Sequence, residues 1–541
     1  MSGETVALRL VRRLRDMGVR HVFGVPSGGW VDYMEALRET DGIDFVLTSH
    51  EGGASFMADV CGRLTGAPGV CFGTFGPGAT NLSTGVGGAL LDRSPMIALT
   101  DEMPAAMRGR VTQMGIDHQA LFAPITKKTV RLDAANIDAI LADAAAVALE
   151  GRAGPVHIGL PVGLSAEIAG GEGEVAVAPA PPAPDAAQLD ALVTAFRAAR
   201  KPVLAVGLSA TRLGIGGRIA ALAERFALPV VLTPMAKGML PESHPGYAGV
   251  LFHALSDEVA KTHAEADLVV AIGYDPVEFN YESWMRDGLP LASIDIAPVD
   301  VDRARHPVVA EVVGDIAAGL AALEAVQAPR KDWALEAVAA RKAAIFQRMR
   351  PQAGAMGPCA ALEVLRDVLP DDGTMTCDVG AHTHLIGQKW PTPAPGLQIM
   401  TNGWSAMGFG LPAAIAAKLC RPEKKVCAVV GDGGFLMTVG ELATAVREKL
   451  PIVVLVLTDN DLALIRIKQQ RKQNPIYGTP VREEGTIGGP SLFGVPVTTA
   501  STPETLRAAL MEAFAADGPR IVEALVDSRE YDGLVLRKDK P

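Results

Sequence analysis

The sequence predicts an α/β protein built from three doubly wound, parallel-sheet domains. Two observations carry this prediction: short, continuous apolar runs recur along the chain, and helical stretches separate them. Residues 22–25, 70–72 and 96–99 are early examples, and residues 452–457 (IVVLVL) are a late one. Strands that alternate with helices connect in parallel, so each such series of elements predicts a doubly wound sheet. A chain of 541 residues also exceeds what one core supports.

Proline- and alanine-rich joints divide the chain into three blocks, with expected boundaries at residues 1–169, 186–325 and 358–530. The segment between the first two blocks, residues 170–185 (GGEGEVAVAPAPPAPD), is typical of a linker. The charged residues 330–350 are predicted to form a helical connector to the third block.

Composition restricts the classes of function. The chain is 49% hydrophobic and 21% charged, as expected of a large globular enzyme. Its net charge of −11 argues against nucleic acid or an anionic membrane as a partner. No apolar run approaches a membrane span and no secretory signal is visible, so we expect a cytoplasmic protein. The six cysteines form no Cys-x-x-Cys pair and are expected to be reduced.

A split signature in the third block is the strongest candidate site. Residues 431–433 (Gly-Asp-Gly) follow one predicted strand, and residues 458–461 (Thr-Asp-Asn-Asp) follow the next. Asp432 and Asp459 are therefore expected at the carboxyl ends of neighbouring parallel strands, where such sheets bind ligands. Their oxygens suit Mg²⁺, and the small residues 433–434 would let a diphosphate approach backbone N–H groups. The alternative interpretation is a strand-helix-strand unit with acidic turns.

This signature resembles the thiamin diphosphate (ThDP) binding motif of the enzyme family that contains acetolactate synthase and pyruvate decarboxylase. The likeness covers residues 4–526, in the order pyrimidine domain, central domain and diphosphate domain. It implies ThDP and Mg²⁺ as cofactors, with Asp432, Asp459 and the backbone carbonyl of Asp461 as metal ligands. Asp459 stands where many relatives carry Asn, a change that keeps a ligand oxygen and adds a negative charge.

Two segments of the first block resemble the pyrimidine-binding domain of the same family. Glu51 begins an alanine-rich helix after a predicted strand, and residues 76–81 (GPGATN) form a turn that opens another helix. The resemblance implies that Glu51 hydrogen-bonds N1′ of the aminopyrimidine and shares the acid–base work with the cofactor. His50 would orient Glu51 or simply pack. The alternative for Glu51 is a surface residue at a helix start.

The resemblance implies further cofactor contacts from the third block. Met407 would be the hydrophobic wedge that bends the cofactor, the Ser405 carbonyl would accept from its 4′-amino group, and Met437 would pack near the pyrimidine. For both methionines the alternative is ordinary core packing. The other implied contacts come from the turns after three predicted strands: Gly380, Ala381, His382, Gly433, Gly434, Leu462, Ala463 and Leu464.

Two departures from the family bear on the substrate. Residues 112–118 (TQMGIDH) align with a loop that usually places an active-site Gln three residues before the Asp. Here Met114 occupies that position, and Gln113, one residue earlier, is the candidate catalytic group. Anabolic acetolactate synthases carry Trp where Lys468 stands. Lys468 could meet a substrate carboxylate, or it could be a solvated helix charge like its neighbour Arg466.

The middle block resembles the central domain of FAD-independent acetolactate synthases through residues 272–279 (IGYDPVEF). Residues 214–218 (GIGGR) lack both the preceding strand and the spacing of a dinucleotide-binding motif. We therefore expect a structural role for this block and regard bound FAD as unlikely.

The reaction implied by the resemblance is decarboxylation of a 2-oxo acid, with pyruvate favoured, followed by carboligation to a second carbonyl. The alternatives are decarboxylation without carboligation, an aldehyde lyase or carboligase for larger substrates, and a non-catalytic ThDP-binding regulatory subunit. Small 2-oxo acids or aldehydes are the expected partners. Because the family shares its sites between two chains, a homodimer or homotetramer is expected.

Overall fold

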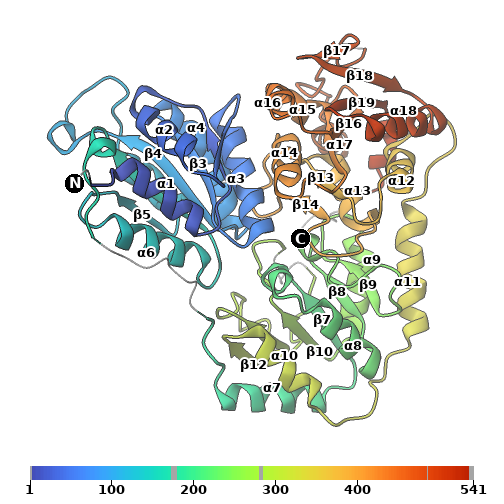
Figure 1. Ribbon diagram of the computed structural model, residues 1–541. Helices are drawn as coiled ribbons and strands as arrows, with labels where there is room; N and C mark the ends of the chain where they lie inside the picture. The colour runs from blue at the N-terminus through green and yellow to red at the C-terminus, as the bar shows by residue number, and fades with distance from the viewer. Residues whose placement is uncertain (1–2, 172–179, 280–283, 484, 535–541) are drawn as a thin grey trace.

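Three sheets organise the chain (Figure 1). The computed structural model describes all residues except 1–2, 172–179, 280–283, 484 and 535–541. Half of the predicted linker, residues 172–179, therefore lies outside the described residues. Each predicted block contains one sheet with helices on both faces, which confirms the doubly wound α/β prediction. The exact domain boundaries stay predictions.

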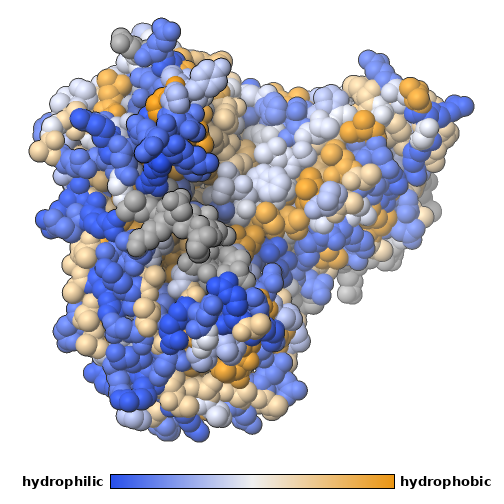
Figure 2. Space-filling view, turned by 180° about the vertical axis from the view of Figure 1, so that it is seen from behind, coloured by the Kyte–Doolittle hydropathy of each residue, from blue (hydrophilic) through white to orange (hydrophobic). Residues whose placement is uncertain are grey.

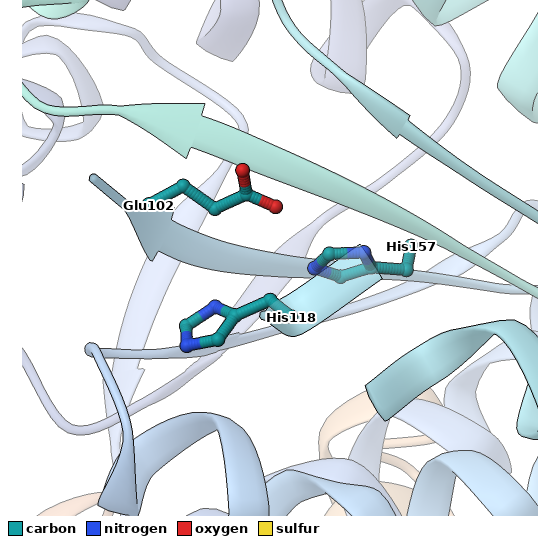
Figure 3. Close-up of side chains that lie close together, drawn as sticks. All are labelled: Glu102, His118 and His157. Carbon is teal, nitrogen blue, oxygen red and sulfur yellow. The ribbon is translucent and has the colours of Figure 1, made fainter. Parts of the chain in front are cut away.

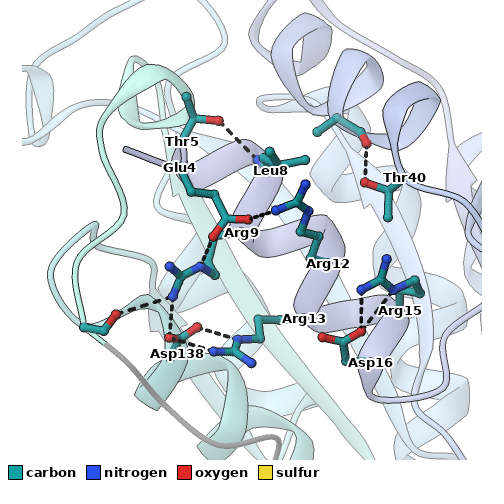
Figure 4. Close-up of polar contacts among 12 residues, drawn as sticks. Glu4, Thr5, Leu8, Arg9, Arg12, Arg13, Arg15, Asp16, Thr40 and Asp138 are labelled. Atoms are coloured by element: carbon teal, nitrogen blue, oxygen red, sulfur yellow. Dashed lines mark hydrogen bonds and ion pairs between the residues drawn. The ribbon is translucent and has the colours of Figure 1, made fainter. Parts of the chain in front are cut away.

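The first sheet has six parallel strands in the order β2-β1-β3-β4-β6-β5. Its strands are β1 (His21–Gly24), β2 (Asp44–Leu47), β3 (Gly69–Gly73), β4 (Met96–Glu102), β5 (Lys128–Arg131) and β6 (Pro155–Pro161). Its helices are α1 (Val6–Asp16), α2 (Val31–Glu39), α3 (Glu51–Thr65), α4 (Pro77–Leu91), α5 (His118–Phe122) and α6 (Ile137–Leu149). Arg9 and Arg13 of α1 both bind Asp138 of α6, which fixes the two outer helices together (Figure 4).

The central sheet also has six parallel strands, in the order β12-β11-β10-β7-β8-β9. They are β7 (Pro202–Val206), β8 (Val230–Leu232), β9 (Tyr247–Val250), β10 (Leu268–Ile272), β11 (Leu291–Asp295) and β12 (Val308–Val313). The helices are α7 (Ala186–Ala198), α8 (Gly216–Phe226), α9 (Ser256–Glu265) and α10 (Ile316–Glu324). The predicted connector contains the helix α11 (Leu335–Arg348).

The third sheet has seven strands, β14-β13-β15-β16-β19-β18-β17. They are β13 (Thr374–Cys377), β14 (Gln398–Met400), β15 (Val426–Gly431), β16 (Ile452–Thr458), β17 (Ser491–Leu492), β18 (Val495–Ala500) and β19 (Arg520–Leu525). The helices are α12 (Pro358–Val368), α13 (Ala381–Lys389), α14 (Gly410–Cys420), α15 (Asp432–Thr438), α16 (Glu441–Arg447), α17 (Ala463–Arg471) and α18 (Pro503–Ala515). The two-residue edge strand β17 runs antiparallel to β18, since Gly494, at φ +81°, permits a tight hairpin. Strand β17 is thus a short antiparallel addition at the edge of a sheet whose other strands are parallel.

The first and third sheets share one core. Helix α14 packs against α3, and Phe56 meets Phe409 edge to face with ring centroids 5.6 Å apart. The thiols of Cys61 and Cys420 lie 3.0 Å apart across the same contact. Figure 2 shows the opposite face of the molecule. This face is hollowed between the first domain, on the right of the view, and the rest of the molecule, and it bears apolar patches. No helix among the described residues is long and apolar enough to cross a membrane.

Candidate active site

Three neighbouring strands of the third sheet end at one cavity. Strands β13, β15 and β16 lie side by side, and each leads directly into a helix, α13, α15 or α17. The cavity at these helix starts measures ≈ 130 Å³. The structure therefore brings together most of the predicted cofactor-binding residues. The lining includes Gly380, Ala381, His382, Met407, Asp432, Gly433, Gly434, Asp459, Asp461, Leu462, Ala463 and Leu464.

Three aspartates crowd one side of this cavity. Asp432 accepts the N–H of Asn460 at 2.8 Å, so the two halves of the split signature touch directly. Asp459 accepts the N–H of Asp461 at 3.2 Å. Desolvation, followed by the charge of Asp432, raises the pKa of Asp459 to about 7. Desolvation also raises the pKa of Asp432. Carboxyls that resist ionisation together are suited to a divalent cation, which would favour their charged forms.

Unpartnered polar atoms support this assignment. Oδ1 of Asp461 and Nε2 of His382 are buried without a hydrogen-bond partner among the described residues. Burial lowers the pKa of His382 to about 4, so its neutral ring can offer a donor or an acceptor to a ligand. The donor set of carboxylates, neutral imidazole and helix-start N–H groups fits a cation together with a diphosphate. The residues present therefore fit Mg²⁺ and ThDP.

Sequence reasoning missed Arg482 and misjudged Arg466. Arg482 donates to the side chain of Asn460 at 3.2 Å, and its guanidinium lies 3.9 Å from Asp432. Arg466 pairs with Asp461 at 2.9 Å and is largely buried, so it is not a solvated helix charge. Both arginines partly balance the acidic group. Neither carries a local motif, and only the folded loop brings Arg482 to the site.

Packing inside the protein restricts the two small residues of the signature, Gly433 and Gly434, in different ways. A Cβ at Gly434 would lie 1.9 Å from Oδ2 of Asp378, so the buried carboxyl of Asp378 excludes any side chain there. At Gly433 a Cβ would lie 2.9 Å from Leu462 and 3.5 Å from Met407. Close packing within the protein therefore already requires glycine at Gly434, independently of a diphosphate.

The wedge loop lies between the first and third sheets. Met407 lines the cavity, whereas Met437 does not and is 61% exposed. Ser405 has φ +54°, a left-handed conformation that is uncommon for a residue other than glycine. Trp404, one residue earlier, packs over α4, and a Cβ at Gly87 would lie 3.0 Å from its ring. Strained backbone of this kind clusters at functional sites, which supports a role for this loop.

A second, larger cavity adjoins the first. It measures ≈ 460 Å³ and lies between the central and third sheets. Val379, Gly380 and Leu464 line both cavities, so the two are contiguous. Lys468 also lines the second cavity, as do Ser405, His253, His384 and Glu278. Sequence reasoning gave no role to the two histidines or to Glu278, although Glu278 belongs to the segment 272–279 that carries the resemblance of the central domain.

Charge in the second cavity is positive or neutral. Burial raises the pKa of Glu278 to about 8, and its carboxyl accepts backbone N–H groups of Leu208 and Met235 at 3.2 and 2.8 Å. Burial lowers the pKa of His384 to about 3. Lys468 is therefore the main charge that faces a ligand here, and the cavity favours an anionic over a cationic group.

Glu51 is buried at the start of α3. Asn81 donates to Glu51 Oε2 at 2.9 Å, so the surface interpretation of Glu51 is wrong. His50 caps the helix by accepting the N–H of Gly52 at 2.9 Å. Glu441 of α16 accepts the N–H groups of Ser49 and His50 at 3.1–3.2 Å. The third domain thus holds the helix start that presents Glu51, a link that sequence reasoning missed.

The structure does not bring Glu51 or Gln113 to the cavity of the third sheet within one chain. The described residues that line that cavity all lie between Val379 and Tyr531. Gln113 is exposed on the loop between β4 and α5, beside Met114, which has φ +58°. Met114 is 46% exposed and Ile116 48% exposed on the same loop.

Comparison with known proteins agrees with this geometry. Three family models match: thiamine pyrophosphate enzyme N-terminal TPP binding domain at residues 4–121, central domain at 189–323, and C-terminal TPP binding domain at 378–524. The chain is 32% identical to an acetolactate synthase of Bacillus subtilis over 97% of this chain and 94% of the relative.

Two further relatives include one that is named for a different activity. The catabolic acetolactate synthase of Raoultella terrigena is 30% identical, over 96% of this chain and 95% of the relative. A probable 2-ketoarginine decarboxylase of Pseudomonas aeruginosa is 35% identical, over 85% of this chain and 83% of the relative. The chain therefore belongs to the thiamin diphosphate-dependent enzymes, and it is an acetolactate synthase-like member of that family.

Proposed function

We propose that this protein decarboxylates a small 2-oxo acid, pyruvate first, and joins the remaining acyl unit to a second carbonyl, with ThDP and Mg²⁺ as cofactors. The single observation that carries the proposal is the pair of contiguous cavities. One is a small acidic and glycine-rich cavity suited to the metal and diphosphate, and the other is a larger cavity that presents Lys468. When bound, ThDP supplies the electron sink for decarboxylation and carbon–carbon bond formation.

The residues of this chain supply binding, orientation and a proton. Asp432, Asp459 and the Asp461 carbonyl would hold Mg²⁺. The turn at Gly380 and His382 would face the diphosphate. Glu51, fixed by Asn81, would hold or release a proton at the pyrimidine nitrogen.

The remaining cofactor contacts are proposed as the resemblance implies them. Met407 would support the cofactor between its rings, and the Ser405 carbonyl would accept from its amino group. Met437 and Gln113 would reach a ligand only from surfaces that are exposed in one chain.

Charge in the second cavity favours a small anionic substrate over a larger cationic one. A guanidinium group, such as the one in 2-ketoarginine, would need a free carboxylate. Among the described residues that line the cavity, Glu278 brings the only carboxyl, and two backbone N–H groups already occupy it. A decarboxylase for a guanidino 2-oxo acid is therefore the second candidate, supported by the relative of Pseudomonas aeruginosa.

A turnover assay with ThDP, Mg²⁺ and pyruvate alone tests the proposal. We expect CO₂ and acetolactate to form in a ratio near one to one. Acetaldehyde without acetolactate would indicate decarboxylation alone. Turnover of 2-ketoarginine but not of pyruvate would establish the second candidate, and no turnover with any 2-oxo acid or aldehyde would favour a non-catalytic subunit.

We also propose that the site is completed by a second copy of the chain, in a homodimer or a tetramer of two dimers. The cavity of the third sheet lacks Glu51, while Met437 on the third domain and Met114 on the first are exposed. Mixing two inactive variants tests this arrangement. Glu51→Gln and Asp432→Ala chains, unfolded and refolded together, should recover about a quarter of wild-type activity, since half of the dimers are mixed and each holds one intact site. No recovery, with mixed dimers present, would contradict a shared site.

A further inference from the structure

Two buried histidines of the first domain have no place in the proposed chemistry. His118 begins α5 and His157 lies on β6, and with Glu102 of β4 they form a cluster (Figure 3). Their ligand atoms lie within 4.8 Å of one another, as in a metal site. Each ring nitrogen of both histidines, however, already has a hydrogen-bond partner. A cation would have to displace these partners, so the cluster is a hydrogen-bonded network and not a vacant metal centre.

From Gly76 to Glu102, every hydrogen bond of the network is donated in the same direction, and the backbone amide of Gly76 fixes that direction. The N–H of Gly76 can only donate, and it lies 3.2 Å from Nε2 of His118. Nε2 must therefore accept, and the neutral ring carries its proton on Nδ1. That proton is donated to the hydroxyl of Thr100 at 2.9 Å. The single available tautomer of His118 thus follows from one backbone amide.

Beyond Thr100 the same direction continues. The Thr100 hydroxyl donates to Nε2 of His157 at 2.8 Å, and Nδ1 of His157 donates to Thr129 at 2.7 Å. Thr129 in turn donates to the side-chain oxygen of Gln119 at 2.7 Å. The amide of Gln119 ends the chain by donating to Glu102, whose other oxygen pairs with Arg131. Every hydrogen in this series of seven side chains and one backbone amide has one consistent position.

The series begins beside Glu51 and the loop that carries Gln113. Gly76 adopts φ +48°, and a Cβ there would lie 2.9 Å from the carbonyl oxygen of Met114. The turn at Gly76 therefore packs against the loop that carries Gln113 and Met114. On its other side, a Cβ at Gly78 would lie 3.2 Å from Oε1 of Glu51, and Asn81 binds the second oxygen.

We propose that His118 is a positioning residue: its neutral Nδ1–H tautomer holds the Gly76 turn, and through that turn aligns Glu51 with the loop of residues 103–117. Thr100 and His157 act through His118 by keeping its proton on Nδ1. This inference rests on the proposed role of Glu51 for its effect on turnover, but the contact itself does not depend on catalysis.

A matched pair of variants tests the acceptor. In His118→Gln, the side-chain oxygen can reach the position of Nε2 and accept from Gly76. In His118→Asn, the shorter amide reaches only the position of Nδ1, next to Thr100. We expect kcat within about threefold of wild type for His118→Gln and at least about tenfold lower for His118→Asn. The affinity for ThDP should change by less than about threefold in both variants, because residue 118 does not line the diphosphate cavity.

Hydrogen exchange gives a readout that is independent of turnover. In peptides that cover residues 73–81 and 103–117, His118→Asn should lose protection relative to wild type, and His118→Gln should keep it. Thr100→Val leaves both histidines in place and removes the hydroxyl that accepts the Nδ1 proton of His118. It should reproduce part of the His118→Asn effect. Thr126→Val, which removes a buried hydroxyl that donates to the carbonyl of Phe122, should not.

The pH profile separates positioning from simple packing. Burial lowers the pKa of His118 despite the opposing charges of Glu102 and Asp117, and Arg131 acts with burial. His157, which faces it through Thr100, is also neutral, since burial lowers its pKa to about 3. Protonation of His118 would remove the acceptor for Gly76, so the turnover of the wild type should fall in acid, at a pH below the usual pKa of histidine.

In His118→Gln that acid limb should weaken or move, while its neutral-pH activity is kept. Wild-type exchange protection in His118→Asn, together with an unchanged pH profile, would overturn the proposal. Absence of turnover in every protein, with the expected exchange pattern intact, would instead refute the proposed function and leave the contact of His118 with Gly76 standing.

Discussion

The side-chain amide of Asn81 donates a 2.9 Å hydrogen bond to Oε2 of Glu51, across the junction of α4 and α3. This contact fixes one carboxylate oxygen and leaves Oε1 on the side of Gly78. Since Asn81 offers only its N–H₂ donors at this contact, it favours a carboxyl oxygen that accepts. A side chain from the same domain therefore binds Glu51 before any second chain is present.

Replacing Glu51 by Gln should separate binding from turnover. The amide keeps the volume and can still accept from Asn81, but it cannot exchange a proton. We expect ThDP affinity within about fivefold of wild type and turnover lower by at least about a hundredfold. Isothermal titration with ThDP and Mg²⁺, followed by steady-state assay, measures both.

Glu35→Gln, on the exposed face of α2, is the matched control and should behave as wild type. Full activity in Glu51→Gln would sink the proposed proton role. Equal loss of ThDP affinity and turnover would instead make Glu51 a binding group.

Met407 offers a test of shape. It lines the cavity of the third sheet and lies 3.5 Å from the position of a Cβ on Gly433. Met407→Leu keeps an apolar side chain of similar volume, whereas Met407→Ala removes it. We expect kcat within about threefold for the first variant and at least about tenfold lower for the second, with little change in melting temperature because Met407 is only half-buried. Equal kcat values in the two variants would contradict a wedge role.

Motifs with fixed spacing were predictable, and contacts between distant segments were not. The split signature placed Asp432 and Asp459 correctly because consecutive parallel strands bring their carboxyl ends together. Arg482 and Glu441 reach the site through loop packing and contact between domains, which no local pattern encodes. The His118 network was equally invisible, since its members come from β4, β5, β6 and α5 and meet only in the folded sheet.

For some residues, the structure explains the residue type or the backbone conformation in a way that the sequence did not suggest. Gly434 is required by the carboxyl of Asp378, and Ser405 adopts a left-handed backbone that its residue type does not predict. The antiparallel edge strand β17 is only two residues long, too short to show a hydrophobic period. The sequence therefore indicated which residues meet at the cavity better than it indicated the packing that holds them.

Asp459→Asn should stabilise the metal-free protein. The folded-state pKa of Asp459 is raised to about 7, so its contribution to stability is full in acid and is lost as pH rises toward 7. Asn does not titrate. In EDTA, the unfolding free energy of Asp459→Asn minus that of wild type should therefore grow by about 2 kcal/mol between pH 5 and pH 7.5, then level off. Urea unfolding at several pH values measures this difference.

With Mg²⁺ and ThDP added, Asp459→Asn should keep activity within about tenfold, because one ligand oxygen remains. Asp459→Ala removes that oxygen and should lose at least about a hundredfold in apparent Mg²⁺ affinity or turnover. A pH-independent difference between Asp459→Asn and wild type in EDTA would show that neither burial nor the charge of Asp432 raises the pKa of Asp459.

Lys468 should contribute to substrate binding through its charge. It lines the second cavity, where Glu278 is occupied by backbone N–H groups and His384 is neutral. An exposed ammonium next to a carboxylate is partly screened by water, so Lys468→Met should raise KM for a 2-oxo acid by about three- to tenfold and change kcat less. Lys472, one turn later and outside the cavity lining, gives the control variant Lys472→Met.

A comparison of acceptors identifies the group that Lys468 meets, since an aldehyde lacks the carboxylate. If Lys468→Met raised the KM of an aldehyde acceptor as much as that of a 2-oxo acid acceptor, the loss would be one of shape, and the lysine would not select for an anion.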